Sequence, residues 1–148
     1  MRFAHPHELL DHVGAEIGVS AWLTIDQTRI DAFRAIVGGP GLGRNRVGDS
    51  AAHGYLLLSL FPRLTTECLA IGQVRRTLNY GLDRLRFVAP VPVGARVRLR
   101  QTIASAEKTA AGGVRLTLDG ALEVEHSHRP AVTGQTVRLI FPGVVDDA

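Results

Sequence analysis

The sequence contains little of what builds disulfide-linked, zinc-binding or membrane-spanning proteins. Its 148 residues include one cysteine, Cys68, so no disulfide can form within the chain and no zinc site of several thiolates is expected. The longest strongly apolar stretch, residues 55–61, is far shorter than the roughly 20 residues that cross a bilayer. The first 19 residues are too polar for the apolar centre of a signal peptide. These absences predict a soluble protein of a reducing compartment, which we expect to be the cytoplasm.

Lysine and aromatic residues are also scarce. Lys108 is the only lysine among 17 basic residues, and aromatic residues make up 5% of the chain. The arginines are scattered between apolar residues and form no basic run, so nucleic acid is not an expected partner. We interpret them as the solvated face of a sheet. The alternative is a site for an anionic ligand such as a phosphate.

The rest of the composition is that of an ordinary globular protein. Hydrophobic residues make up 45% of the chain and charged residues 21%, and the formal net charge is +3. These values fit one folded domain over residues 1–148. The first half has helical periodicity and the second half alternates with a period of two, which predicts an α+β fold.

Three helices are expected in the first half. A short one covers residues 6–13, and Asp26 is the expected N-cap of a second helix. A third helix follows a cap at Asp49 or Ser50 and is apolar on every side, so it should lie buried in the core. Pro62 should end or kink this third helix late.

The second half reads as strands. Leu78, Tyr80 and Leu82 form the first alternating set, and on the next strand apolar residues face one way and arginines the other. The pair at 112–113 marks a hairpin, and Gly120 marks a bulge or a close backbone approach. One apolar helix followed by long antiparallel strands predicts a sheet curved around a central helix, the hot-dog architecture. Such a sheet leaves an edge strand open, so we expect a homodimer that pairs two edges.

Three blocks of the sequence carry a family resemblance: residues 20–33, residues 52–60, which begin Ala-His-Gly, and residues 79–94, which begin Asn-Tyr-Gly. In this order they resemble the MaoC-like dehydratases, the (R)-specific enoyl-CoA hydratases. The resemblance implies a hot-dog fold and a small-molecule partner that is an acyl-CoA, an acyl group on a carrier protein or a polyketide-type molecule. No cofactor is expected, and no metal, since the two His-x-His pairs lack a nearby carboxylate–histidine set.

The catalytic motif of that family has no counterpart here. In the family it reads Gly-Asp, four residues, then His, and the Asp and His together activate a water for addition to an acyl thioester. Gly39 stands where the Asp would be, the loop is several residues shorter, and no histidine lies between His12 and His53. Hydratase activity is therefore not transferred from the fold alone.

Candidate catalytic residues gather at the start of the buried helix. The resemblance implies that the backbone amide of Gly54 holds the thioester carbonyl, which a residue without a side chain lets approach closely. The alternative is that Gly54 permits close helix–sheet packing. His53, kept neutral by the positive helix end, would act as a base with Asp49 as its orienting or acid/base partner. The alternative is a cap at Asp49 or Ser50, with His53 hydrogen-bonded to the backbone.

Other residues are candidates for holding the substrate. Arg44 and Arg46 lie on the shortened loop and would hold an anionic or enolate-like group, or are ordinary solvated charges. Ser59 matches a family serine that faces the pocket, or else bonds back one helical turn. Tyr80 either donates into the pocket or is a core residue. The substrate-binding candidates are Arg44, Arg46, Ser50, Ser59, Asn79 and Tyr80.

Three functions fit this sequence. The first is an enzyme that polarises an acyl carbonyl at the helix start and runs an altered proton transfer: dehydration, isomerisation or cyclisation of an acyl-thioester or polyketide-type substrate. Cyclisation suits a site without water activation, because positioning alone can supply several kcal/mol. The second is a non-catalytic acyl-binding subunit that pairs with an active hot-dog partner. The third is a true enoyl-CoA hydratase whose dyad has moved.

Overall fold

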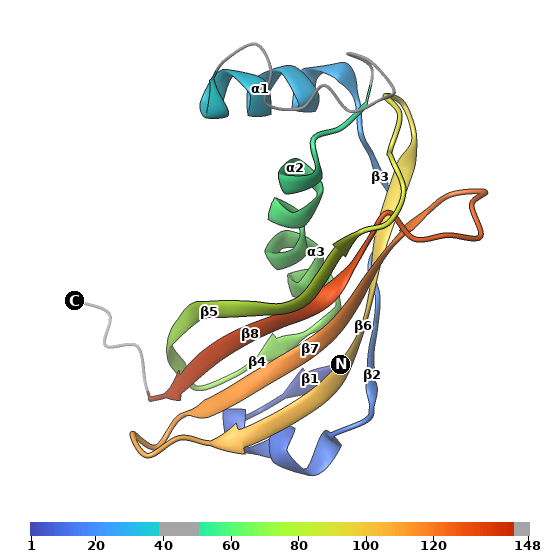
Figure 1. The fold of residues 1–148 in the computed structure, drawn as a ribbon. Coiled ribbons are helices and arrows are strands. Elements are labelled where there is room, and N and C mark those ends of the chain that lie inside the picture. The colour runs from blue at the N-terminus through green and yellow to red at the C-terminus, as the bar shows by residue number, and fades with distance from the viewer. Residues whose placement is uncertain (39–50, 144–148) are drawn as a thin grey trace.

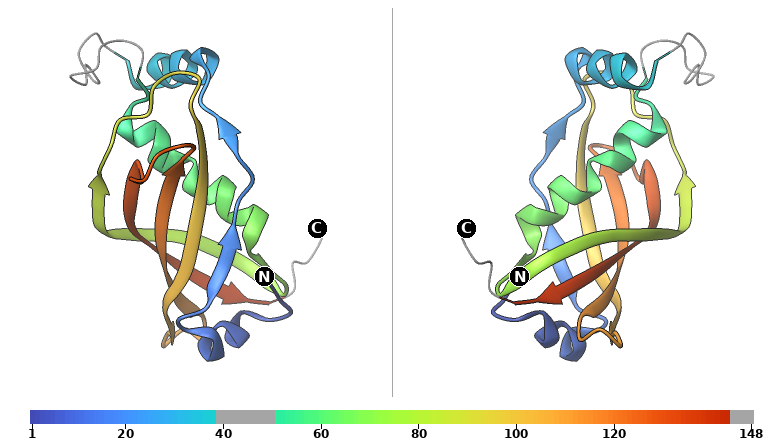
Figure 2. Two further views of the ribbon diagram at one scale, coloured as in Figure 1. Left: turned by 90° about the vertical axis from the view of Figure 1, so that its right-hand side faces the viewer. Right: turned by 90° about the vertical axis from the view of Figure 1, so that its left-hand side faces the viewer.

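A curved antiparallel sheet encloses a central helix in the computed structural model, which describes residues 1–38 and 51–143 (Figures 1 and 2). The strand order is β2-β6-β7-β8-β5, with β3 also paired to β6, so β5 is an edge strand. All pairs within this sheet are antiparallel. The predicted α+β fold is confirmed. The strands of the sheet are β2 (Glu16–Val19), β3 (Leu23–Thr24), β5 (Val74–Phe87), β6 (Arg96–Lys108), β7 (Val114–Val124) and β8 (Val132–Pro142).

The central helix consists of two pieces, α2 (Gly54–Ser59) and α3 (Phe61–Cys68). They cross the concave face of the sheet (Figure 2). Proline has no amide proton for the carbonyl one turn earlier, so Pro62 interrupts the hydrogen-bond ladder and the helix breaks at Leu60. The kink predicted from the sequence is confirmed.

The helix approaches the sheet closely at Gly120 of β7. A Cβ atom on this residue would lie 2.9 Å from Cε2 of Phe61, which is closer than real contacts allow. The Phe61 side chain is only 1% exposed and packs in a cluster with Leu99 and Leu122 of the sheet. Glycine at 120 therefore allows the ring to settle against the sheet, and the predicted close approach is confirmed.

Shorter elements close the two ends of the sheet. The 3-10 helix η1 (Pro6–His12) lies at one end and α1 (Gln27–Val37) at the other (Figure 1). Oδ1 of Asp26 accepts a hydrogen bond from the Arg29 amide at 2.9 Å, as expected of the α1 N-cap. The strands β1 (Arg2–Phe3) and β4 (Ala70–Ile71) form a separate parallel pair. In the described part of the chain, no helix is long and apolar enough to span a membrane.

The central helix begins later than predicted. Residues 51–52 pair with residues 91–92 through a β-bridge and a 2.8 Å backbone hydrogen bond. This pairing keeps their backbone extended, so the helix begins at Gly54 with His53 as its N-cap. The prediction of a cap at residues 49–50 is therefore wrong.

The arginines of β6 lie on the solvated face of the sheet, as interpreted from the sequence. Arg98 and Arg100 each donate from Nε to Glu123, at 2.6 and 2.8 Å. Burial alone would raise the pKa of Glu123, but the hydrogen bonds from Arg100 and Arg98 outweigh it and hold the pKa below its usual value. Because these arginines already have carboxylate partners, they do not form an open anion site.

The edge strand β5 departs from the predicted alternation. Its register against β8 shifts between Asn79 and Gly81 and again further along. Leu78, Tyr80 and Leu82, the apolar residues of the predicted alternating set, are 40%, 63% and 46% exposed. The cause is the edge position, because β8 is the only described strand that pairs with β5 in this sheet. The alternative that Tyr80 is a core residue is therefore wrong.

Candidate functional site

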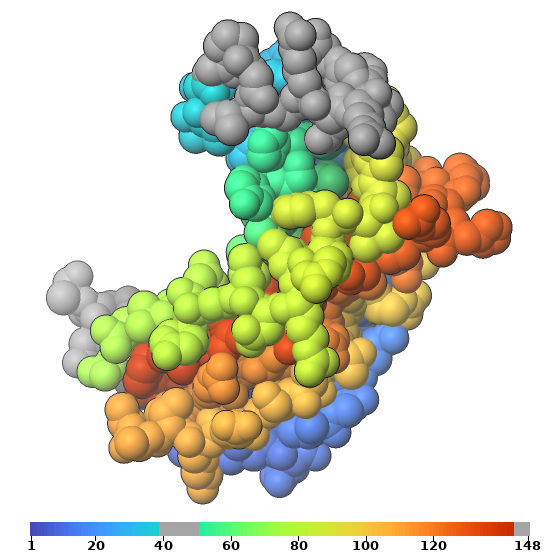
Figure 3. All heavy atoms as spheres, in the orientation of Figure 1, coloured from blue at the N-terminus to red at the C-terminus, as the bar shows by residue number. Residues whose placement is uncertain are grey.

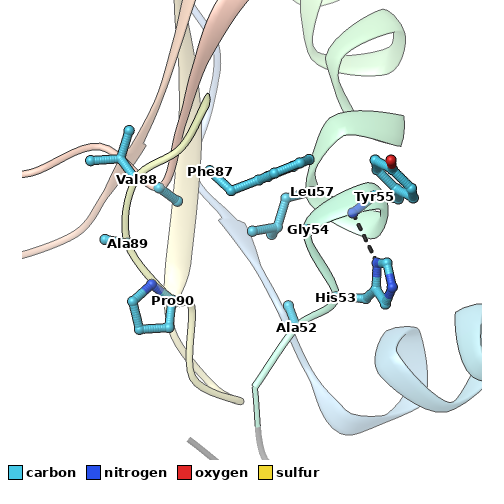
Figure 4. A pocket seen from close by; sticks show the side chains of 10 residues that line it. Ala52, His53, Gly54, Tyr55, Leu57, Phe87, Val88, Ala89 and Pro90 are labelled. Carbon is cyan, nitrogen blue, oxygen red and sulfur yellow. Dashed lines mark hydrogen bonds between the residues drawn. The ribbon is translucent and has the colours of Figure 1, made fainter. Parts of the chain in front are cut away.

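A cavity of about 420 Å³ lies between the start of α2 and the end of β5. We call it the first cavity. Most of its lining side chains are apolar, and among the described residues no carboxylate lines it. Figure 4 shows Phe87 and Leu57 pointing toward each other across it. The lining residues are Ala52, His53, Gly54, Tyr55, Leu57, Phe87, Val88, Ala89, Pro90 and Ala131.

Gly54 provides the first backbone amide of α2 at this cavity. No acceptor for this amide is found among the described residues, and it lies at the positive end of the helix. A Cβ atom on Gly54 would lie 2.8 Å from Cδ1 and Cε1 of Phe87, so the ring rests directly against the glycine. The Phe87 side chain is 49% exposed, which leaves it room to turn aside. A bound carbonyl can then approach the amide without meeting a side chain at Gly54.

His53 caps the helix with its own ring. Nδ1 accepts a hydrogen bond from the Tyr55 amide at 3.0 Å (dashed in Figure 4). A nitrogen that accepts carries no proton, so the neutral ring has its proton on Nε2. The ring centroid lies 5.4 Å from that of Phe33 and 5.5 Å from that of Tyr55. His53 can therefore donate from Nε2, whereas serving as a base through Nδ1 would require it to release the cap.

We expect His53→Ala to lower the free energy of unfolding by about 0.5–2 kcal/mol, the usual cost of losing an N-cap. His53→Asn keeps an oxygen that can accept from the Tyr55 amide, so its stability should stay close to that of the wild type. Urea denaturation of the three proteins measures both values. Equal losses in the two variants would show that the ring contributes through its packing and not through the cap.

A second cavity, of about 320 Å³, lies further along the helix, beside the junction of α2 and α3 and strands β5 and β8. The predicted site residues are therefore divided: His53 and Gly54 line the first cavity, and Ser59, Asn79 and Tyr80 line the second. The residues that line the second cavity are Leu58, Ser59, Phe61, Pro62, Asn79, Tyr80, Gly81, Leu82, Thr136, Val137 and Arg138.

Ser59, Tyr80 and Asn79, three of the candidates for substrate binding, have further contacts besides lining the second cavity. Ser59 Oγ donates to the carbonyl of Leu56 at 2.7 Å, which is the bond back along the helix stated as the alternative. The Tyr80 ring lies with its centroid 5.9 Å from the Arg115 guanidinium carbon. Asn79 stands opposite Arg138 in the pairing of β5 with β8.

Arg44, Arg46, Asp49 and Ser50 lie outside the described residues, as does Gly39 and the stretch where the family's motif would fall. In the part of the chain that is described, no three histidine, cysteine or carboxylate side chains are grouped as a metal site.

Two residues at these cavities were missed from the sequence. The sequence pattern indicated for Phe87 only an apolar strand residue, and Arg138 was one of many scattered arginines. For Phe87 a signal existed, because it directly precedes the turn that the resemblance includes. For Arg138 no local signal existed, because only strand register decides which face a side chain takes.

Comparison with known proteins identifies the family. No family model matches the chain. The 3-hydroxyacyl-thioester dehydratase Z of Mycobacterium tuberculosis is 33% identical over 138 residues, which cover 88% of this chain and 91% of that protein. The chain belongs to the MaoC-like family of hot-dog dehydratases. A second relative of this MaoC-like protein, nodulation protein N of Rhizobium leguminosarum bv. viciae, is 35% identical over 144 residues, with 86% of each chain covered.

Solved structures share the hot-dog fold with this MaoC-like protein. The MaoC-like dehydratase from Rhodospirillum rubrum superposes with a TM-score of 0.71 at 15% identity, over 90% of this chain and 94% of that one. At this level of identity the likeness concerns the fold alone, so the predicted hot-dog architecture is confirmed and the chemistry has to be argued from the cavities.

Proposed function

We propose that this MaoC-like protein acts on acyl thioesters, with the Gly54 amide polarising the thioester carbonyl in the first cavity. The observation that carries the proposal is the first amide of α2, which has no acceptor within residues 1–38 and 51–143 and lies beside a largely apolar cavity. The half-exposed Phe87 ring rests against Gly54 there. The relative named as a 3-hydroxyacyl-thioester dehydratase supports this substrate class. The acyl group would be carried by coenzyme A or by a carrier protein.

The N-terminal end of α2 would stabilise negative charge on the thioester carbonyl. Negative charge that develops on a carbonyl oxygen at Gly54 would meet an N–H donor and the positive end of the helix dipole. Removing one such donor in other enzymes raises the barrier by roughly 3–4 kcal/mol. His53 can add a second donor from Nε2. A carbonyl polarised in this way makes the neighbouring carbon more acidic, which favours proton transfer there.

The proton transfer itself is proposed for His53 and Asp49. Because Nδ1 of His53 accepts from the Tyr55 amide, the neutral ring would act by hydrogen-bonding from Nε2, and Asp49 would take the proton from the carbon beside the carbonyl and return it to the substrate. The sequence has no histidine between His12 and His53, so a water-activating dyad of the family's kind is absent from this stretch. The proposed reaction is dehydration, isomerisation or cyclisation of an enoyl, 3-hydroxyacyl or polyketide-type substrate, and cyclisation suits a site that does not activate water. Arg44, Arg46 and Ser50 are the proposed contacts to its polar groups.

Purified protein should convert 3-hydroxyacyl-CoA or enoyl-CoA thioesters into products that mass spectrometry and chiral chromatography can distinguish. His53→Asn keeps the cap but removes the Nε2 donor, so we expect its turnover to fall at least tenfold while its unfolding is unchanged. Normal turnover in this variant would limit His53 to capping the helix. Robust hydration of crotonyl-CoA by the wild type would instead support a true hydratase with a relocated dyad.

We also propose a homodimer that forms through β5. Seven of the ten exposed large apolar side chains of the described residues lie on α1, α2 or β5, around a surface that Figure 3 shows hollowed between α1 and β5. Pairing with a second β5 would satisfy the open edge and cover these side chains. They are Ile36, Val37, Tyr55, Leu78, Tyr80, Leu82 and Phe87.

Leu78→Lys is expected to convert the dimer into a monomer, because a charge on the edge strand opposes pairing with a second strand. Sedimentation velocity measures the change. Val13→Lys is the matched control, since Val13 is 53% exposed and lies beyond the end of η1, away from β5. A dimer that survives Leu78→Lys would contradict pairing through β5. A wild type that aggregates unless a second hot-dog chain is present would support the non-catalytic subunit instead.

A further inference from the structure

Arg138 of β8 lies on the concave face of the sheet, among residues of the core. It stands opposite Leu116 of β7 and Asn79 of β5 in the strand pairing, and Leu116 is completely buried. Thr136 and Ile140, two residues to either side, are also buried. Alternate residues of a strand share one face. The register of β8 therefore turns this arginine toward the central helix, away from the solvated face that holds the arginines of β6.

The guanidinium of Arg138 has no counter-charge among the described residues. Within residues 1–38 and 51–143, no ion pair or hydrogen bond involves its side chain. Burial lowers the pKa of Arg138 below its ordinary value, yet an arginine stays charged in a protein. Arg138 itself is partly exposed. A charge that is partly withdrawn from water without a partner costs free energy, and an anion bound beside it would reduce that cost.

The second cavity provides the space for such an anion. Arg138 and Thr136 both line it, Thr136 is only 8% exposed, and Oγ1 of Thr136 has no hydrogen-bond partner among the described residues. Asn79 adds an amide from the neighbouring strand. Leu58 and Pro62 of the helix contribute apolar walls. The cavity therefore combines one cation and two neutral polar groups with surfaces that accept methylene groups.

The two cavities follow one another along the central helix. Leu57 lines the first cavity and Leu58 lines the second. From Gly54 to Phe61 the helix advances seven residues, which is about 10 Å at 1.5 Å per residue. An extended chain advances about 3.8 Å for every three bonds, so about eight bonds cover this distance.

We propose that Arg138, assisted by Thr136 and Asn79, binds a carboxylate at the far end of an acyl chain whose thioester lies at Gly54. The protein then prefers chains of about eight to ten carbons that end in a carboxylate over chains that end in a methyl group. A guanidinium binds a carboxylate through two parallel hydrogen bonds, which gives this site its preference for that group. The thioester end of this inference rests on the proposed function, whereas the anion site does not.

Calorimetric titration tests the anion site without any turnover. Octanoate and octanamide have the same length and differ in charge, and we expect the wild type to bind octanoate at least tenfold more tightly. Arg138→Met should abolish that difference. Arg115→Met, the same change one strand away on a residue beside Tyr80, should retain it. Equal affinities of the wild type for the two probes, or an unchanged preference in Arg138→Met, would overturn the proposal.

The thioester preference is tested with trans-2-decenedioyl-CoA and trans-2-decenoyl-CoA. The ratio of their kcat/KM values should favour the diacid at least tenfold in the wild type and reverse in Arg138→Met. If neither thioester is converted, the proposed function fails, while the titration still decides on the anion site.

Arg138→Lys keeps the positive charge but lacks the planar guanidinium, so its preference for the diacid should be weaker than that of the wild type. This variant tests the proposal if Arg138→Met does not fold. A dimer weakened by Arg138→Met with no change in ligand preference would assign Arg138 to a carboxylate of a second copy and overturn the proposal.

Discussion

Gly54→Ala is expected to lower kcat/KM for the thioester substrate by about a hundredfold or more, with no loss of folding stability. The added Cβ would lie 2.8 Å from the Phe87 ring, which is half exposed and can turn away. Alanine also favours the helix more than glycine does. Alanine keeps the amide N–H, but its Cβ would stand where the thioester carbonyl has to approach, so the substrate would lose this hydrogen bond. Losing one donor of this kind raises the barrier by roughly 3–4 kcal/mol.

Two variants control this experiment. Gly81→Ala places a methyl group where no atom lies within 4 Å, so it should leave unfolding unchanged and serves as the control for stability. The double variant Gly54→Ala/Phe87→Ala removes the ring that the new methyl group displaces. Activity restored by the double variant would mean that the displaced ring had blocked the first cavity. Full activity in Gly54→Ala alone would contradict the role of the Gly54 amide.

Gly120→Ala is expected to have the opposite pattern, with a loss of about 1–3 kcal/mol in the free energy of unfolding, as for other overpacked cores. Its Cβ would meet the Phe61 ring at 2.9 Å, nearly the same distance as at Gly54. Phe61 is 1% exposed, however, and packs with Leu99 and Leu122, so turning its ring would disturb the core. Urea denaturation measures the loss against Gly81→Ala, and an unchanged midpoint would show that the core around Phe61 can relax.

Much of the fold could be predicted from local patterns. The cap at Asp26 and the break near Pro62 depend on one residue and its immediate neighbours, so the sequence alone predicts them. The close approach at Gly120 followed from a glycine within an alternating strand. The helix start did not follow, because it depends on residues 51–52 pairing with a segment forty residues away.

Strand faces were harder to predict than strand positions. A shift of one residue moves every side chain to the other face, and the shifts in β5 leave no sign in the sequence. The same limit concealed Arg138, whose inward direction comes from its pairing with Leu116. At the candidate site, His53 and Gly54 of the Ala-His-Gly sequence line the same cavity. The sequence could not show that the His53 ring is already engaged by the Tyr55 amide.

The two glycine–phenylalanine contacts have different implications for how homologous chains can vary. Phe61 is locked against Gly120, so a homologue with an aromatic residue at position 61 must keep glycine at 120, whatever compound it converts. Phe87 contacts Gly54 at the protein surface, so the side chain at position 87 can change in size together with the substrate that binds there. Substrate preference can therefore diverge at the start of the central helix while the packing of Phe61, in the middle of the helix, against β7 stays fixed.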